Sequence, residues 1–379
     1  MRYYIIAGEA SGDLHGSNLM KGLFCEDPTA QIRFWGGSLM NEVSTANGQG
    51  PDALVRDYAQ TAVMGITEVL LKARSIARNI KNCKEDILEW KPDVIILIDY
   101  PGFNFKIARF AHENGFKVFW YIAPKVWASR EGRIRKIKKY VDKLFIVFPF
   151  EKEYFSSKGI DYIYCGNPLV DAIDNKKPGA APAEAEGHPY LALLAGSRGH
   201  EIKSTMPVFL KLAKDLQQTP GYQDYKFLVA GAPSKKLEDY ARWTGEDSPL
   251  QVVFGKTHQI IAGARAAVIN SGTASLEAAL IGTPQVVVYR LSRISAAIGR
   301  IIIKVKYISL GNLICDRLIF KELLQKDFTP AKVKEEVLLL TSDKQYIARM
   351  KEGYAQIREL LGGGGASAAV ARAIIDSAK

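Results

Sequence analysis

Several features that mark common classes of protein are missing from this sequence of 379 residues. It has only four cysteines, far apart and without a C-x-x-C spacing, which argues against a zinc site or a disulfide framework. No apolar run approaches the roughly 20 residues of a membrane-spanning helix, and the first residues lack a signal-peptide pattern. We therefore expect reduced cysteines, and contact with the surface of a membrane if the protein meets one.

Acidic residues are too few to balance the basic ones. Lysine and arginine total 51 against 40 aspartate and glutamate, a formal net charge of +11. Such a surplus predicts an anionic partner, which composition alone leaves open between nucleic acid, an anionic membrane and phosphorylated ligands. The basic residues have no aromatic-interleaved or helix-turn-helix setting, and this argues against nucleic acid.

Short apolar runs alternate with longer amphipathic segments along most of the chain. The run Val94–Ile98, bounded by Pro92 and Pro101, is typical of a strand buried on both faces of a parallel sheet. Further strands are expected at 3–7, 32–35, 117–122, 144–147, 191–194, 226–229, 251–254, 267–269 and 285–288. Helices are expected at 17–24, 64–87, 103–114, 275–280, 331–360 and from 366 onward. This order predicts an α/β fold.

The series divides into two Rossmann-like, doubly wound domains. The first covers residues 1–171 and the second 190–345, with a linker or surface loop rich in Pro, Ala and Gly at 172–189. The C-terminal helices at 346–379 are expected to pack on the first domain or to be exchanged in a dimer. Two such domains facing across a cleft bind ligands at the carboxyl ends of their strands.

The first domain offers two candidate loops. Gly8 to Asp13 is a turn of small residues between a strand and a helix, where N–H groups can meet an anion, or simply a tight turn without a ligand. It is not a G-x-G-x-x-G fingerprint, and Glu9 disfavours a nearby phosphate. Asp99 ends the buried strand and is either a general base or an aspartate that satisfies loop amides.

The second domain also offers two candidate loops. In Gly196-Ser197-Arg198, the arginine offers a bidentate fork for a diphosphate or forms a surface salt bridge. In Ser271-Gly272-Thr273, amides and hydroxyls suit phosphate oxygens, and Glu277 suits ribose hydroxyls. A capping box ending at Glu277 is a compatible alternative.

No D-x-D pair occurs, although metal-dependent sugar transfer commonly needs such carboxylates beside the diphosphate. We therefore predict no metal site, and neutralisation of the diphosphate by Arg198 and helix dipoles.

Three segments suit an anionic lipid surface. Residues 130–143 are strongly basic, and residues 294–306 mix isoleucines with Arg and Lys. The third segment is an apolar cluster, which consists of Met64, Ile66, Val69, Leu70 and Leu71. Each segment taken singly also fits an ordinary solvated or core-facing helix.

A set of short motifs in this order resembles lipid-A-disaccharide synthase, from residue 3 to about 330. The motifs are Gly8-Glu-Ala-Ser-Gly-Asp13, Val63-Met-Gly65, Lys91-Pro-Asp93, Ile98-Asp-Tyr-Pro-Gly-Phe-Asn104, Pro124-Lys-Val-Trp-Ala128, Phe148-Pro-Phe-Glu151, Gly196-Ser-Arg-Gly-His-Glu201, Ser271-Gly-Thr-Ala274 and Ser309-Leu-Gly-Asn-Leu-Ile314.

The resemblance implies a GT-B fold and an inverting transfer that needs no cofactor. The donor would be UDP-2,3-diacylglucosamine and the acceptor 2,3-diacylglucosamine 1-phosphate (lipid X), giving a β-1,6-linked disaccharide 1-phosphate and UDP. It implies a cytoplasmic protein attached peripherally to the inner membrane of a Gram-negative bacterium. It also implies that dimers with exchanged C-terminal segments can form.

The resemblance gives individual residues roles. Asp99 matches the proposed base, and Glu9 and Ser11 match the acceptor-side loop. Arg198 matches the UDP-binding arginine, with Asn312 and Gln325 near the donor. The apolar cluster at 64–71 matches the membrane-docking patch.

Two departures from the family pattern are visible, and two rival functions stay open. Ala195 replaces a proline, and Gly311 replaces another, which predicts a more mobile loop around Asn312. One rival is a UDP-sugar 2-epimerase of the same fold, which would isomerise a UDP-sugar without an acceptor. The other is a basic nucleic-acid-binding protein, which would bind DNA and not UDP.

Overall fold

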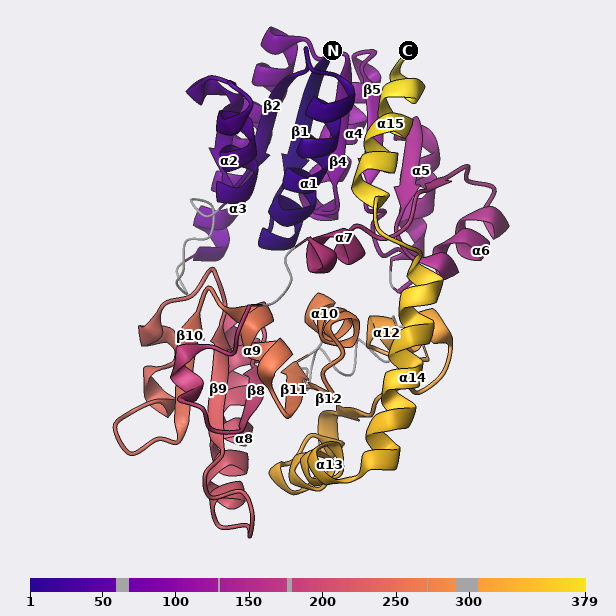
Figure 1. The fold of residues 1–379 in the computed structure, drawn as a ribbon. Helices are drawn as coiled ribbons and strands as arrows, with labels where there is room; N and C mark the ends of the chain where they lie inside the picture. The colour runs from indigo at the N-terminus through magenta and orange to yellow at the C-terminus, as the bar shows by residue number, and fades with distance from the viewer. Residues whose placement is uncertain (59–67, 129, 176–178, 271, 291–305) are drawn as a thin grey trace. The chain divides into compact units, whose positions relative to one another are not determined.

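The computed structural model describes residues 1–58, 68–128, 130–175, 179–270, 272–290 and 306–379, with side chains left out at 68–74. The chain forms two compact units (Figure 1). Unit 1 consists of Met1–Ala172 and Gly363–Lys379, and unit 2 of Ile173–Gly362. The chain therefore passes from one unit to the other twice.

Unit 1 is built on a parallel sheet of seven strands in the order β3-β2-β1-β4-β5-β6-β7. Its strands are β1 (Arg2–Ala7), β2 (Gln31–Gly36), β3 (Leu54–Asp57), β4 (Val94–Ile98), β5 (Lys117–Tyr121), β6 (Lys143–Ile146) and β7 (Ile163–Tyr164). The central strands β1 and β4 are almost fully buried, because helices cover both faces of the sheet.

The helices of unit 1 come mostly from the first part of the chain. They are α1 (Ala10–Glu26), α2 (Ser38–Ala46), α3 (Glu68–Trp90), α4 (Pro101–Glu113), α5 (Ile134–Tyr140), α6 (Pro149–Ser157), α7 (Pro168–Asp174, which ends across the boundary) and α15 (Ala366–Ala378). Helix α15 returns from the end of the sequence to pack along α1 (Figure 1). Asp171 holds its start by accepting hydrogen bonds from the N–H groups of Gly365 and Ser367.

Unit 2 repeats the design with six parallel strands in the order β10-β9-β8-β11-β12-β13. The strands are β8 (Tyr190–Leu194), β9 (Lys226–Gly231), β10 (Leu250–Phe254), β11 (Ala266–Asn270), β12 (Gln285–Tyr289) and β13 (Glu322–Leu324). The helices are α8 (Gly199–Gln217), α9 (Thr257–Gly263), α10 (Thr273–Ile281), α12 (Leu310–Cys315), α13 (Pro330–Ser342) and α14 (Lys344–Leu361).

Each sheet has one point where the strand order reverses. In unit 1 this point lies between β1 and β4, and in unit 2 between β8 and β11. In open parallel sheets, ligands bind beside the carboxyl ends of the two strands at such a switch point. The topology thus predicts where to look for a site in each unit.

The predicted α/β fold and the ten predicted strands are confirmed, but some boundaries were wrong. The first helix starts at Ala10 and not at residue 17, and the helix predicted at 331–360 is two helices separated at Asp343. Strands β3, β7 and β13 were not predicted.

The predicted linker at 172–189 is partly built into unit 2. It contains a 3-10 helix at Ala183–Ala185, whose Ala185 is buried in the core of that unit. Glu184 forms an ion pair with Lys256 at 2.8 Å. These contacts give the end of the segment a fixed place on unit 2.

Candidate functional site

The switch point of unit 1 brings Glu9 and Asp99 to neighbouring strand ends. Ala7 of β1 lies in register with Ile98 of β4, so the residues that follow them begin adjacent loops. Gly8 passes under the ring of Tyr100, which would stand 2.3 Å from a Cβ atom at this position. Only glycine fits there, which explains the first residue of the motif.

Asp99 has an unusual backbone conformation. Its φ angle is +40° and that of Tyr100 is +45°, a region that costs free energy for residues other than glycine. The side chain of Asn104 supports the turn, because its amide nitrogen donates to the carbonyl oxygens of Asp99 at 2.8 Å and of Ile98 at 3.3 Å. Asn104 is fully buried on the first turns of α4. Its part in holding Asp99 was not predicted.

The carboxyl group of Asp99 lies in a mixed electrostatic environment. Burial raises its pKa, the charge of Lys125 and the N–H of Tyr100 lower it, and the charge of Glu9 raises it further. The net result is a pKa above the ordinary value for aspartate. A carboxylate with a raised pKa is a stronger base, which suits the predicted role.

Ser11 and Glu9 lie exposed where α1 begins, and Glu9 is the residue before the helix. Asp13 of the same motif has a different role. It is buried and accepts hydrogen bonds from the N–H groups of Gly37, Leu39 and Met40, so that it ties α1 to the start of α2. The motif therefore combines an exposed edge with a structural anchor.

The switch point of unit 2 carries the loop of Gly196, Ser197 and Arg198. Glu201 on the first turn of α8 accepts the N–H groups of Ser197 and Arg198 at 3.0 Å each, and pairs with the Arg198 guanidinium at 3.1 Å. Arg198 remains 62% exposed, whereas Glu201 is only 9% exposed. The salt-bridge interpretation of Arg198 is thus confirmed, and its exposure leaves room for a ligand as well.

Across the switch point, Gly272 and Thr273 begin α10 at the end of β11. No side chain among the described residues caps this helix, so the predicted capping box is wrong. Glu277, one turn into α10, instead has its Oε2 atom 3.3 Å from the Nε2 atom of His258. An uncapped helix N-terminus suits an anion.

Asn312 and Gln325 lie farther along unit 2. Asn312 is fully buried, and its amide nitrogen donates to the Phe320 carbonyl and to Glu322, each at 2.9 Å. Its oxygen accepts from the backbone of Ile319 and Phe320. Direct contact between Asn312 and a donor stays a prediction, and it would require one of these bonds to break. Gln325 follows β13, half-exposed, with a φ angle of +53°.

Some predicted residues lie outside the described part of the chain. These include Met64, Ile66 and Ser271, and also the segment 291–305. Val69, Leu70 and Leu71 fall within α3, but their side chains are not described. The predicted membrane patch therefore stays a prediction.

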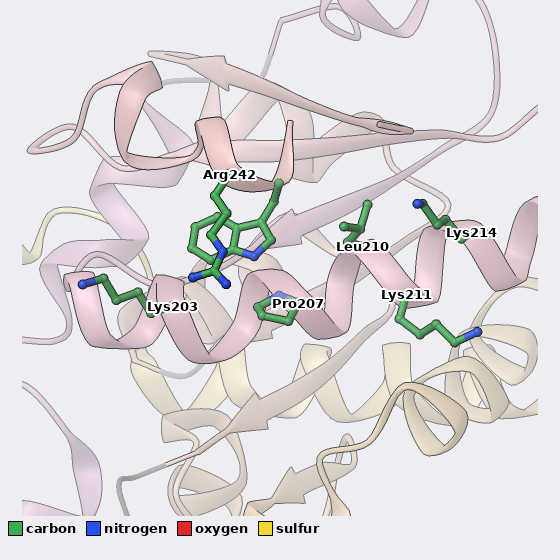
Figure 2. Close-up of a pocket in the computed structure, with 7 residues that line it drawn as sticks. Lys203, Pro207, Leu210, Lys211, Lys214 and Arg242 are labelled. Atoms are coloured by element: carbon green, nitrogen blue, oxygen red, sulfur yellow. The ribbon is translucent and has the colours of Figure 1, made fainter. Parts of the chain in front are cut away.

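A separate cavity of about 600 Å³ lies along α8 in unit 2 (Figure 2). Its apolar lining consists of Pro207 and Leu210 on α8 and the half-buried Trp243, which belongs to a 3-10 helix at Ala241–Trp243. The cationic side chains around it are Lys203, Lys211, Lys214 and Arg242. Lys211 pairs with Asp215, but within the described ranges the other three have no ion-pair partner. Sequence analysis did not identify this cavity.

Two kinds of feature are absent from the described residues. These residues hold no group of three or more His, Cys, Asp or Glu side chains placed to bind a metal ion. Within the same ranges, no helix combines the length and the apolar character needed to cross a membrane.

The family model and the most similar curated proteins point to the same family. The model of a family described as lipid-A-disaccharide synthetase matches residues 3–371. The chain is 34% identical to the lipid-A-disaccharide synthase of Trichlorobacter lovleyi, over 99% of this chain and 97% of that one. It is 36% identical to that of Syntrophus aciditrophicus, over 96% and 94%.

Solved structures show the same fold at low sequence identity. A UDP-GlcNAc 2-epimerase from Methanocaldococcus jannaschii, in complex with UDP-GlcNAc and UDP, has a TM-score of 0.66 and 12% identity, over 99% of this chain and 100% of that one. The calicheamicin glycosyltransferase CalG4 has a TM-score of 0.59 and 15% identity, over 100% and 98%. These similarities identify the GT-B fold, which transferases and epimerases share, so the fold alone does not separate transfer from epimerisation.

Proposed function

The chain belongs to the lipid-A-disaccharide synthetase family, and we propose that it transfers 2,3-diacylglucosamine from UDP-2,3-diacylglucosamine to lipid X. It is a glycosyltransferase of lipid A biosynthesis with the GT-B fold. The products of the proposed reaction are a β-1,6-linked disaccharide 1-phosphate and UDP. The family match covers nearly the whole chain, and this favours transfer over the epimerase and nucleic-acid alternatives.

One observation carries the assignment of the site. The two predicted reactive residues, Asp99 and Arg198, both follow strands that flank a switch point, β4 in unit 1 and β8 in unit 2. Carboxyl ends of strands at a switch point are where open α/β sheets bind ligands. The two residues belong to different units, and the proposed displacement requires them to act on the same pair of substrates.

Asp99 is proposed to be the general base. It would take the proton from the 6′-hydroxyl of the acceptor while the hydroxyl oxygen attacks C1 of the donor sugar. The bond from C1 to the diphosphate oxygen breaks on the opposite face, UDP leaves, and the configuration at C1 inverts. Asp99 is half-buried at the end of its strand, with a raised pKa, and these features support the role.

Unit 2 is proposed to hold UDP. Arg198 would neutralise the diphosphate, together with the helix N-termini that begin at Gly199 and Thr273. Glu277 would accept hydrogen bonds from the ribose hydroxyls. This arrangement offers positive charge without a metal ion, so we expect the transfer to proceed in the presence of EDTA.

An anionic membrane surface is the proposed site of action, because both substrates carry acyl chains. The α8 cavity supports this proposal, because its lining combines the apolar side chains of Pro207, Leu210 and Trp243 with cationic ones, a combination that suits the lipid–water interface. Figure 2 shows the lysines and Arg242 around it. Helix α5 adds a second basic face. It buries Ile134 and Ile137 and exposes Arg135, Lys136, Lys138 and Lys139.

A turnover assay tests the proposal directly. Purified protein is mixed with UDP-2,3-diacylglucosamine and lipid X in detergent micelles with EDTA, and disaccharide 1-phosphate and UDP are quantified. We expect both products in equal amounts, a β linkage by NMR, and no turnover for Asp99→Asn, which should still bind UDP. Product that forms only after a divalent metal ion is added would contradict metal independence. Isomerised UDP-sugar in the absence of acceptor would contradict transfer.

A further inference from the structure

Two sequence motifs of unit 1, Pro124 to Ala128 and Phe148 to Glu151, have no role in the site described so far. They follow the adjacent strands β5 and β6, on the carboxyl side of the sheet. Because β5 pairs with β4, the first of these loops is the direct neighbour of the Asp99 turn. The motifs therefore lie where they can influence Asp99.

Glu151 joins the two loops. Its side chain is fully buried, and its Oε2 atom accepts the N–H groups of Val147 and Phe148 at 3.0 Å each. Its Oε1 atom accepts the indole N–H of Trp127 at 3.0 Å. A buried carboxylate that accepts several hydrogen bonds fixes all of its donors in position, since losing any one of them is costly.

Aromatic packing strengthens the connection. The ring of Trp127 meets that of Phe150 edge-on, with centroids 4.8 Å apart, and Phe150 stacks on Phe148 at 5.4 Å. Such pairs prefer these geometries and restrict the motion of the rings. The loop after β5 is therefore held to the loop after β6 by both a hydrogen bond and packed rings.

Lys125 lies in the loop after β5, which Trp127 and its contacts hold to the loop after β6. It is exposed, and the buried Val126 separates it from Trp127. Its charge acts on Asp99, whose pKa it lowers, and the charge of Glu9 opposes it from the loop after β1. The two strands next to β4 thus bring opposite charges to the candidate base. Lys125, after β5, supplies a cation, and Glu9, after β1, supplies a competing anion.

We propose that Glu151 and Trp127 are positioning residues that hold Lys125 beside Asp99, and that Lys125 keeps this carboxylate ready to accept a proton. The proposal rests on the proposed role of Asp99 as the base. It gives a function to the two motifs, 124–128 and 148–151, that had no role in the site. A cation on the neighbouring loop favours the ionised base, and a shift of that loop would weaken the effect.

The test compares pH profiles of kcat/KM for the full-length protein and variants. For Lys125→Met we expect the acidic limb to move to higher pH by about one unit, because the pKa of Asp99 rises without the cation. Lys125→Arg should restore the limb. Trp127→Phe keeps an aromatic ring but removes the donor to Glu151, and should move the limb in the same direction and lower kcat about tenfold.

Glu151 can itself titrate in the range of the assay. Burial raises its pKa to about 7, although the N–H groups that bind it and the charge of Lys125 lower it. Because Lys125 lowers the pKa of both carboxyl groups, Lys125→Met is also tested in the Glu151→Gln background, where position 151 no longer titrates and a shift of the limb reports Asp99. Glu151→Gln should resemble Trp127→Phe. If that variant does not fold, Trp127→Phe decides the matter. Glu153→Gln, exposed on the same helix, is the matched control.

Two results would overturn the inference while leaving the proposed function intact. The first is a wild-type pH profile for Lys125→Met in a protein whose Asp99→Asn variant is inactive. The second is a wild-type profile and kcat for Trp127→Phe. Normal turnover by Asp99→Asn would instead overturn the proposed base, and with it this extension. UDP binding by calorimetry should be unchanged in every variant, and a loss would contradict a role confined to unit 1.

Discussion

The guanidinium Nη1 of Arg198 donates a hydrogen bond to Glu201 Oε1 at 3.1 Å, while the backbone N–H of the same arginine donates to Glu201 Oε2 at 3.0 Å. One carboxylate thus fixes both the loop and the side chain that is proposed to meet the diphosphate. Gly196 allows this approach, because a Cβ atom there would stand 2.5 Å from Glu201 Oε2.

We expect Glu201→Ala to weaken UDP binding about tenfold, because the loop N–H groups and the guanidinium lose their common acceptor. Calorimetric titration with UDP measures the change. Glu201→Gln keeps one oxygen for the loop and should have an intermediate effect. Glu246→Ala, exposed in the same unit, is the control. Tighter binding by Glu201→Ala would show that Glu201 competes with the diphosphate for Arg198, contrary to this expectation.

Asn104→Ala should lower kcat about tenfold with little change in UDP affinity. The side chain holds the Asp99 backbone in a conformation that costs free energy, so its loss should let the turn relax and the carboxylate move. Steady-state kinetics and UDP titration separate the two effects. Asn114→Ala at the other end of α4 is the control, since its exposed side-chain amide donates to the Phe110 carbonyl, far from Asp99 along the helix. Unchanged kcat would mean that the turn keeps its shape without Asn104.

The activity should fall on the acidic side at a pH above the ordinary range for aspartate. Burial raises the pKa of Asp99, Lys125 lowers it, and Glu9 raises it. The base must be ionised, so kcat/KM is lost as the pH drops through this raised value. Glu9→Gln removes a like charge, and should move the acidic limb to lower pH by about half a unit. Glu42→Gln, exposed on α2, should leave the profile unchanged. A shift to higher pH for Glu9→Gln would contradict the assignment.

Binding to anionic vesicles should depend on the α8 cavity. The triple variant Lys203→Gln, Lys214→Gln and Arg242→Gln should bind phosphatidylglycerol vesicles about a hundredfold less tightly, since each basic residue near an anionic surface contributes about 1 kcal/mol. A variant with Lys344, Arg349 and Lys351 changed to Gln has the same net charge and changes only α14. Equal losses in a sedimentation assay would show a nonspecific charge effect. Equal binding to neutral phosphatidylcholine vesicles would contradict an electrostatic contact.

Buried strands were the easiest elements to predict. Val94–Ile98 and Tyr190–Leu194 are covered on both faces, and so their sequences are continuous apolar runs between turn residues. Strand β3 (Leu54–Asp57) lies at the sheet edge and is only half-buried, which leaves a short and mixed sequence without a recognisable pattern. Burial and length together decide which strands a sequence reveals.

The start of α1 shows packing overriding local preference. Gly12 and Gly16 are poor helix formers, and the helix was predicted only from residue 17. In the structure Gly16 lies against Met40, whose sulfur would stand 2.6 Å from a Cβ atom at that position. The glycines let α1 lie close to its neighbours, and a contact with a distant part of the chain cannot be seen in local periodicity.

Only part of the candidate site could be predicted, because some of its residues depend on contacts that the local sequence does not show. Asp99 could be found because it follows an apolar strand directly, and Arg198 because it lies in the short loop after one. The residues that hold them, Asn104, Glu151 and Glu201, act through hydrogen bonds whose partners depend on loop geometry. Their residue types alone gave no signal that distinguishes a buried anchor from an exposed polar side chain.

Helix α15 has a consequence for how the protein is made. It completes unit 1 by packing along α1, where Gly22 lies close to Ala371, yet it is translated after the whole of unit 2. During synthesis the first 172 residues therefore leave the ribosome with one side of α1 uncovered, while unit 2 can fold without waiting. Unit 1 becomes complete only when residues 363–379 have emerged, so this protein should finish folding with its first domain last.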